Sequence, residues 1–420
     1  RIALNMIYTV VFKLLNSYTM KKIITLLILP LFIGCKQVPA QKPNDAEAST
    51  KQELTGAAKY FAEMEAKALS EPYRGIETEN GKELGLFSIK STGVSTAPIQ
   101  KAAELFLNSL TKDQQEKTQF DIEDEEWRKW CNVDNGIYDR QGVSLKEMTE
   151  EQKKVAFGLM QASLSAKGLR LSKDIMKTDQ TLKELNNGDL AYDEELYFFT
   201  IMGTPSDTGP WGWQLDGHHL VINYFVLGNQ VVMSPVFMGG EPIITTSGKY
   251  EGNTLFQDEQ NLGLDFMQSL SSELQTEATL SLSKRNNDIK AEASKDNVTL
   301  NYEGVPVSKL SEEQKEKLVH LITQYINNME EGHHQLKMEE IMTHWDKTYF
   351  AWVGETAPDA VFYYRIHSPV VLIEFDHQAA VGVPNSPKGP TLNHIHTVVR
   401  TPNGNDYGKD LLHQHLEKSH

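Results

Sequence analysis

The strongest constraint on the fold is a sequence pattern that occurs twice. Residues 141–153 align without gaps with residues 303–315, and both segments have Gly-Val at their second and third positions and end in Glu-Glu-Gln-Lys. Thr149 and Ser311 each stand three residues before a Gln, which is the spacing of a helix capping box. Apolar residues at helical spacing follow in both places. The repeat predicts equivalent helix starts in two halves of the chain.

A second pair of similar segments follows in the same order. Residues 197–203 resemble residues 349–354, and residues 213–224 align with residues 364–375. Each half therefore has a helix followed by strands, which predicts an internal duplication. The polar, aperiodic stretch near residues 280–300 is the expected boundary. Strands grouped after helices favour an α+β fold with antiparallel sheets over a doubly wound parallel sheet.

Periodicity also predicts the individual elements. Helical patterns cover residues 97–110, 149–163, 172–186, 262–276 and 312–330. Strand patterns cover residues 219–227, 230–237, 361–367, 370–376 and 396–401. The first two of these strands are joined by Gly228-Asn229 and form a predicted hairpin. We expect one large duplicated domain over residues 61–420, with approximate halves 95–280 and 300–420.

The N-terminal region resembles a targeting segment. Met20 and two lysines precede an apolar run over residues 23–33, which ends in Gly34-Cys35. This order is typical of a bacterial lipoprotein signal, in which Cys35 becomes the lipidated first residue. We expect residues 1–34 to be an upstream extension plus signal peptide and residues 35–60 to be a tether.

These features predict a location in the cell envelope, outside the cytoplasm, with membrane contact through the lipid anchor only. The alternative is a two-part apolar anchor from Ile7 to Ile33, interrupted by Lys13, Asn16 and Lys21. The apolar run itself is shorter than the about 20 residues of a membrane span.

Charge and cysteine content narrow the possible chemistry. The chain has 57 Asp and Glu against 41 Lys and Arg, a formal net charge of −16, which argues against a general nucleic-acid surface. With only two cysteines, Cys35 and Cys131, there is neither a disulfide framework nor a cysteine-rich zinc site. Cys131 stands beside Trp130 and is expected to pack in the core. Histidine and carboxylate remain as the candidate functional groups.

The sharpest histidine motif is Asn-His-Ile-His at residues 393–396. In a strand, His394 and His396 point to the same face, where two imidazoles can hold one metal ion. The alternative is a pair of partly exposed histidines on a sheet face. His218 and His219 open the predicted hairpin and alternate between faces, so at most one of them joins a given site. Their alternative is one buried core histidine and one exposed histidine.

Two carboxylates lie on an otherwise apolar strand. Glu374 and Asp376 share one face, which is costly unless they are paired or bind a cation. The alternative for both is a salt bridge to Arg365 or Arg400. The repeat places Glu374 on the face that corresponds to that of His219.

A site between the halves could therefore combine His219, Glu374, His394 and His396, a set that suits zinc, copper or ferrous iron. In such a site Glu374 or Asp376 would serve as general base. His415, in a short predicted C-terminal helix, could approach a ligand from outside.

Several linked motifs resemble the bacterial family catalogued as domain of unknown function 3500. They lie at residues 195–206, 211–220, 363–366, 372–376, 393–396 and 406–412. The resemblance runs from about residue 95 to the end of the chain. It implies that Gly-His-His, Asn-His-Ile-His and Asp-Leu-Leu-x-x-His415 are recurring polar features. His377 and His413 depart from the pattern, which puts a role for these two in doubt.

Two interpretations of function follow. The first is an exported metal-dependent enzyme, hydrolase-like, that acts on a small molecule. The second is a non-catalytic envelope lipoprotein that binds a metal or small ligand, with structural histidines. An open coordination position beside an unliganded carboxylate would favour the enzyme, and a closed four-ligand site would favour the second interpretation.

Overall fold

The computed structural model describes residue 54 and residues 56–418, and these residues form one compact unit. The predicted signal peptide, Cys35 and most of the predicted tether lie outside the described residues. Helix α1 (Gly56–Leu69) begins inside the stretch expected to be a tether. Of the helices that the structure describes, none is long and apolar enough to cross a membrane.

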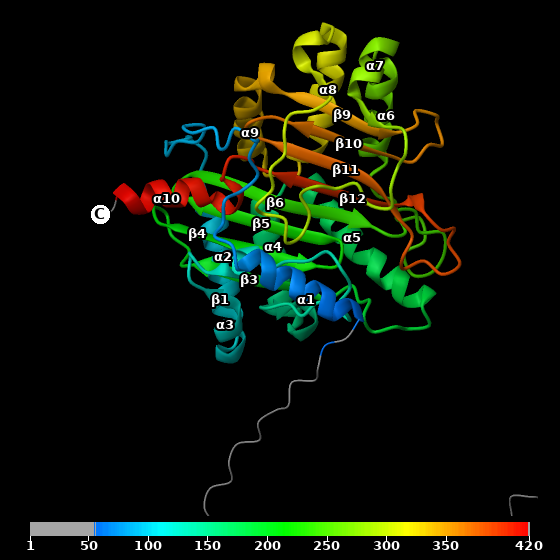
Figure 1. The fold of residues 1–420 in the computed structure, drawn as a ribbon. Coiled ribbons are helices and arrows are strands. Elements are labelled where there is room, and N and C mark those ends of the chain that lie inside the picture. Colours follow the sequence, from blue (N-terminus) through cyan, green and yellow to red (C-terminus); the bar gives the residue numbers. More distant parts are fainter. Residues whose placement is uncertain (1–53, 55, 419–420) are drawn as a thin grey trace, which may run out of the picture. The chain divides into compact units, whose positions relative to one another are not determined.

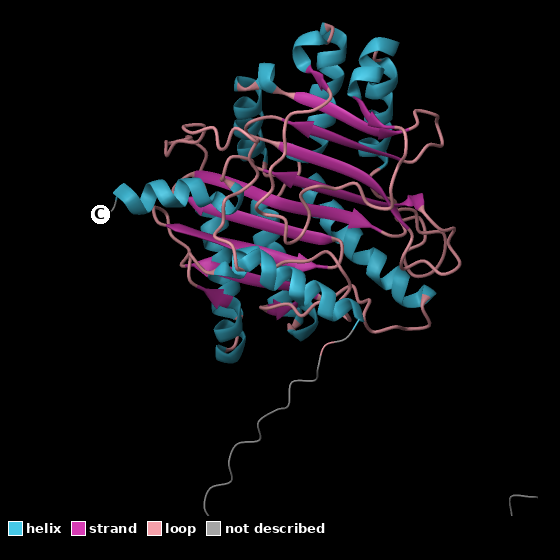
Figure 2. Ribbon diagram, viewed as in Figure 1, coloured by secondary structure: helices cyan, strands magenta, loops and turns pink. Residues whose placement is uncertain are grey.

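The fold is built on one 12-stranded sheet that is mostly antiparallel (Figures 1 and 2). The strands are, in chain order, β1 (Gln119–Phe120), β2 (Val143–Ser144), β3 (Tyr197–Gly203), β4 (Pro210–Gly217), β5 (Leu220–Leu227), β6 (Gln230–Gly240), β7 (Thr279–Ser281), β8 (Val305–Pro306), β9 (Tyr349–Gly354), β10 (Phe362–His367), β11 (Leu372–Ala379) and β12 (Pro390–Arg400). Their order in the sheet is β1-β3-β4-β5-β6-β12-β11-β10-β9-β7, with β2 on β3 and β8 on β9. The predicted α+β class is confirmed.

The two halves of the sheet pair in the same way. In the first half β3 lies parallel to β1 and antiparallel to β2 and β4, and in the second half β9 has the same relation to β7, β8 and β10. Trp213 pairs with Tyr224 as Tyr364 pairs with Phe375. The halves meet where β6 lies antiparallel to β12. The origin of the halves by duplication stays a prediction.

Most predicted helices are present, with boundaries close to the predicted ones. After α1, the described helices are α2 (Ala97–Ser109), α3 (Lys112–Thr118), α4 (Glu150–Ser163), α5 (Ala166–Leu185), α6 (Gln257–Ser269), α7 (Ser272–Ala278), α8 (Glu312–Ile326), α9 (Glu331–Thr343) and α10 (Lys409–Lys418). The capping boxes predicted at Thr149 and Ser311 are both formed. The single helix predicted over 262–276 is two helices, because Leu270 is extended and the side chain of Ser271 caps α7.

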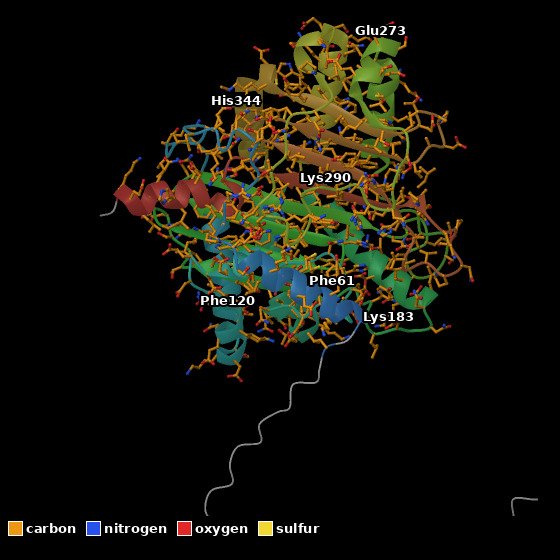
Figure 3. All side chains as sticks on the ribbon, in the orientation of Figure 1. Phe61, Phe120, Lys183, Glu273, Lys290 and His344 are labelled. Atoms are coloured by element: carbon orange, nitrogen blue, oxygen red, sulfur yellow. The ribbon has the colours of Figure 1, made fainter. Side chains whose placement is uncertain are left out.

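One face of the sheet is apolar and packs on helices. Side chains project from the sheet and from the helices alike (Figure 3). Phe199 of β3 lies 5.5 Å from Phe106 of α2, measured between ring centroids. In the second half Phe350 of β9 lies 4.7 Å from Phe266 of α6. Burying such aromatic side chains supplies much of the driving force for folding.

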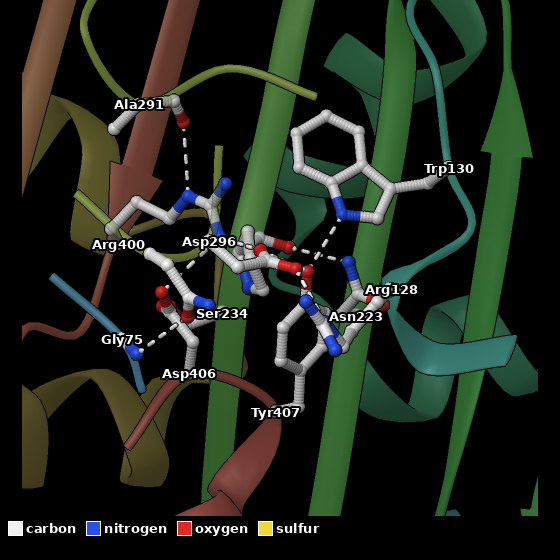
Figure 4. Close-up of polar contacts among 12 residues, drawn as sticks. Gly75, Arg128, Trp130, Asn223, Ser234, Ala291, Asp296, Arg400, Asp406 and Tyr407 are labelled. Carbon is white, nitrogen blue, oxygen red and sulfur yellow. Dashed lines mark hydrogen bonds and ion pairs between the residues drawn. The ribbon is translucent and has the colours of Figure 1, made fainter. Parts of the chain in front are cut away.

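The other face carries buried charges that loops and the C-terminal segment cover (Figure 4). Arg400 of β12 pairs with Asp296 at 2.8 Å and with Asp406 at 3.2 Å. Arg128 pairs with Asp296 at 2.9 Å, and the hydroxyl of Tyr407 donates to the same carboxylate. Because these charges are paired and hydrogen-bonded, the network ties distant parts of the chain together and has a structural role.

Candidate metal centre

The turn between β4 and β5 directs two adjacent histidines to different neighbours. His219 has a φ of 59°, in the left-handed region, so the alternation expected of a strand does not apply at this point. The His218 ring stacks on the His219 ring with centroids 3.9 Å apart. His218 turns towards α5, and His219 turns towards the start of β12.

His219, His394 and His396 come together in one buried group. The Nε2 atom of His394 lies 3.2 Å from that of His219 and 2.9 Å from that of His396. One ligand atom from each residue can be chosen so that all three lie within 4.8 Å of one another. Two nitrogens bound to one ion at about 2.0–2.1 Å would be about 2.9 Å apart at a right angle and about 3.4 Å apart at the tetrahedral angle. The observed separations match this range.

Backbone packing makes room for this arrangement. Gly239 of β6 is the register partner of His396. A Cβ atom at Gly239 would lie 2.9 Å from the His396 ring and 2.8 Å from the carbonyl oxygen of Ile395. The glycine therefore lets the His396 ring lie against β6, close to the other two imidazoles.

The protonation of the group follows from its contacts. His394 Nδ1 lies 2.7 Å from the carbonyl oxygen of Ala379, so Nδ1 carries the proton and Nε2 is left with a lone pair. Burial lowers the pKa of all three histidines, that of His219 and His396 well below the usual range. Neutral imidazoles with converging nitrogens are the form in which histidine binds metal ions.

A buried carboxylate stands behind the cluster. Glu241, just beyond β6, lies 3.4 Å from His394 Nδ1. Its oxygens accept hydrogen bonds from the backbone N–H groups of Val381, Gly382 and Val383. A carboxylate next to the outer nitrogen of a metal-binding histidine orients the ring and increases its basicity. Glu241 was not predicted, and its only sequence signal is an acid between two apolar segments.

A second missed carboxylate supports the turn. Asp179 of α5 lies 2.5 Å from His218 Nδ1, and its other oxygen accepts a hydrogen bond from the hydroxyl of Tyr197 at 2.7 Å. The sequence feature that could have indicated Asp179 is its place on the apolar stripe of a helix, where Ile175 and Leu182 are also buried. Because a carboxylate accepts, His218 Nδ1 donates in this contact, and its Nε2 faces away from Asp179.

Both predicted catalytic carboxylates make several polar contacts. Glu374 accepts hydrogen bonds from the N–H groups of Lys290 and Ala291 and from the hydroxyl of Tyr363 at 2.6 Å. It is not part of the three-histidine group. The predicted alternative was a salt bridge of Glu374 to Arg365 or Arg400. Arg365 pairs instead with Glu303, and Arg400 pairs with Asp296 and Asp406.

Asp376 is the register partner of His396, so it shares that face of the sheet. It lies 2.9 Å from the ammonium group of Lys284 and accepts a hydrogen bond from the N–H group of Asp288. Burial raises the pKa of Asp376 to about 8 against the opposing effect of Lys284. A general-base role for Glu374 or Asp376 stays a prediction.

The remaining predicted residues lie elsewhere. His415 belongs to α10, which follows the far end of β12, and is not part of the three-histidine group (Figure 1). Cys131 is buried as expected, and burial raises the pKa of its thiol to about 12. A thiol with so high a pKa is a poor nucleophile.

The fold and the site together define an α+β protein with a buried group of three histidines beside the central strands of one sheet. The family model described as "Protein of unknown function (DUF3500)" matches residues 92–409, which is most of the chain. The chain belongs to this family, as its motifs predicted. No curated protein and no solved structure matches the chain.

Proposed function

We propose that the protein binds one divalent transition-metal ion through the Nε2 atoms of His219, His394 and His396 and uses the ion for hydrolytic chemistry on a small molecule. The observation that carries the proposal is the convergence of the three nitrogens. His394 Nε2 lies 3.2 Å from His219 Nε2 and 2.9 Å from His396 Nε2. His394 Nε2 has only a lone pair to offer. A cation between the rings satisfies all three nitrogens at once.

The donor set limits the choice of metal. Three imidazole nitrogens suit zinc, copper or iron, and they leave a coordination position for water or substrate. An ion in such a site polarises a bound oxygen and lowers the pKa of a bound water to about 7.

His218 supports the hydrolytic assignment as a proton acceptor. Its ring lies against His219, and Asp179 holds the proton on its other nitrogen. The pairing of a histidine with a carboxylate is a common arrangement for a general base. Glu374 and Asp376 remain the alternative bases, and their contacts with Lys290, Ala291 and Lys284 favour structural roles.

The burial of the cluster favours a second candidate, a metal-binding protein without catalysis. His219, His394 and His396 are only 3%, 4% and 6% exposed. A metal in so enclosed a site could stabilise the junction of β6 with β12 without meeting a substrate. Activity and metal content must therefore be measured on the same samples.

Elemental analysis of the purified protein tests the metal site. We expect about one equivalent of a single transition metal in the wild type and less than about a tenth of an equivalent in a His394→Ala/His396→Ala variant, because one ligand alone cannot retain the ion. A His320→Ala/His413→Ala variant is the matched control, since it removes two exposed histidines outside the group. Equal, substoichiometric metal in all three proteins would refute the site.

The same three proteins separate the two candidates. A panel of ester, amide and phosphate substrates is tested before and after chelation and after metal is restored. Turnover that follows the metal content supports the enzyme. Full metal occupancy without turnover on any substrate supports the non-catalytic candidate.

A further inference from the structure

A second region with unassigned chemistry lies on the helix-covered face of the sheet, where the two halves meet. Strands β6 and β12 and helices α8 and α9 surround a cavity of about 280 Å³. Thr397 and Val399 line the cavity and alternate along β12 with His396, so they point to the opposite face of the sheet. The cavity and the three-histidine group share no residue.

Part of the cavity lining is apolar. This part includes Val236, Met238, Phe256, Ile326, Met329 and Val399. Ligand pockets commonly have volumes of about 300–1,000 Å³, so this cavity fits a small ligand. A cavity of about 150 Å³ holds benzene, which makes two fused rings a suitable size here.

Two buried polar atoms of the lining have no partner. Asn328 is 5% exposed and His333 is 3% exposed. Neither Asn328 Oδ1 nor His333 Nε2 makes a hydrogen bond. The other amide atom of Asn328 lies 3.8 Å from the sulfur of Met238. Unpartnered buried polar atoms are unfavourable, and native proteins contain few of them.

His333 is buried although polar or small residues precede it. It follows Glu330, Glu331 and Gly332 and lies in the first turn of α9. Burial lowers its pKa, so the imidazole is neutral near neutral pH. The nearby ammonium group of Lys337 pairs with Glu340 and donates to the carbonyl of Val370. The two unpartnered atoms, Asn328 Oδ1 and His333 Nε2, therefore belong to an amide and to a neutral imidazole, and neither carries a charge.

We propose that this cavity binds a neutral, mainly apolar small molecule that carries one hydroxyl group. The apolar body fills the space against β6 and β12. The hydroxyl donates its one hydrogen to Asn328 Oδ1, and its oxygen accepts a second hydrogen bond from the N–H group at His333 Nε2. The proposal is independent of the metal site, because it rests on different residues on the opposite face of the sheet.

The probes 2-naphthol and naphthalene test this assignment because they differ only in the hydroxyl group. Binding to the purified full chain is followed by probe fluorescence. We expect saturable binding of one 2-naphthol per chain, tighter than naphthalene by at least about 2- to 10-fold, which is the value of one of its two hydrogen bonds. In an Asn328→Leu variant the preference for 2-naphthol should shrink by about this factor, and in an Asn328→Leu/His333→Leu variant the two affinities should become equal.

A cavity-filling variant locates the binding. Val399→Trp should abolish binding of both probes, and Val231→Trp, at another half-buried position of the lining, provides a second such variant if the first fails to fold. Val381→Trp is the matched control because Val381 is 81% exposed and outside the lining. Near-ultraviolet circular dichroism identifies the variants that keep the wild-type fold.

Three outcomes would overturn the proposal. They are an absence of saturable binding by the wild type, equal affinity of the wild type for both probes, and undiminished binding by a correctly folded cavity-filling variant. Loss of metal in the His394→Ala/His396→Ala variant without loss of 2-naphthol binding would confirm that the two sites are separate.

Discussion

At the scale of single residues, the contact between His394 and Ala379 decides what the histidine group can do. Nδ1 can donate to the carbonyl only if it carries the proton, so Nε2 can only accept. A hydrogen bond from the Nε2 of either His219 or His396 would satisfy the lone pair of His394 Nε2. The Nε2 of the remaining histidine would then have no partner in the group. A metal ion would accept a lone pair from all three Nε2 atoms, which is why we propose a ligand set rather than a hydrogen-bonded core.

Glu241 should set the strength of metal binding. Replacing Glu241 with Gln keeps the side-chain shape but removes the negative charge 3.4 Å from His394 Nδ1. We expect the metal affinity to fall by about 10- to 100-fold, the usual cost of losing a partner behind a metal ligand. Competition with a chromophoric chelator measures the change.

Glu251→Gln is the control for this prediction, because Glu251 is exposed and the substitution is chemically the same. Equal metal affinity in the Glu241 variant and the control would show that Glu241 does not act on the site.

At the scale of elements, the sequence predicted what periodicity encodes. Strands β5, β6, β10, β11 and β12 were found because alternating residues face two different layers. The short strands β1, β2, β7 and β8 were not predicted, since two or three residues carry no period. Helix α9 was missed because its residues show no apolar stripe and its start resembles a polar helix end.

The same limit applies to the site. His394 and His396 could be paired from their spacing alone, and Gly-His-His indicated His219. Glu241 and Asp179 could not be assigned, because each acts through a partner that is distant in the sequence. Only the three-dimensional fold brings Glu241 next to His394 and Asp179 next to His218.

His377 of β11 makes the stability of the fold depend on pH. Its Nδ1 accepts from the N–H group of Phe362, and its Nε2 lies 2.9 Å from the amide oxygen of Gln260, so the buried ring is neutral. Burial lowers its pKa to about 3, with a further contribution from Lys284. The unfolded histidine binds a proton below about pH 6.5. Unfolding therefore takes up a proton, and stability is lost as the pH falls below that value.

Denaturant unfolding at two pH values tests this. Between about pH 7 and about pH 5 the free energy of unfolding of a His377→Gln variant should fall by ~2 kcal/mol less than that of the wild type. His320→Gln, at an exposed position, should follow the wild type. Parallel curves for all three proteins would contradict the prediction.

At the scale of the whole molecule, β12 joins the two halves. It pairs with β6 on one side and β11 on the other, and it also supplies Arg400 to the polar network and two histidines to the candidate metal centre. The core, the charged face and the site therefore depend on the same strand.

A chain that ends at Gly389 should fail to fold. It lacks β12 and α10, so β6 and β11 both become open edges and Asp296 loses Arg400 and Tyr407. Removal of one partner from a buried charge pair costs about 3–5 kcal/mol, a large part of the stability of a typical domain. Calorimetry should show no cooperative transition for this chain and a normal one for a chain that ends at Lys418. A cooperative transition within a few degrees of the wild type would contradict the prediction.

The central place of β12 also sets the order of events during synthesis. β6 ends at Gly240 and β12 begins at Pro390, so at about 5–20 residues per second the ribosome delivers the partner of β6 roughly 8–30 s later. During that time the unpaired edge of β6 is open to wrong partners. The central sheet cannot be completed until residues 390–400 have been synthesised, so we expect the edge of β6 to need protection from aggregation during synthesis.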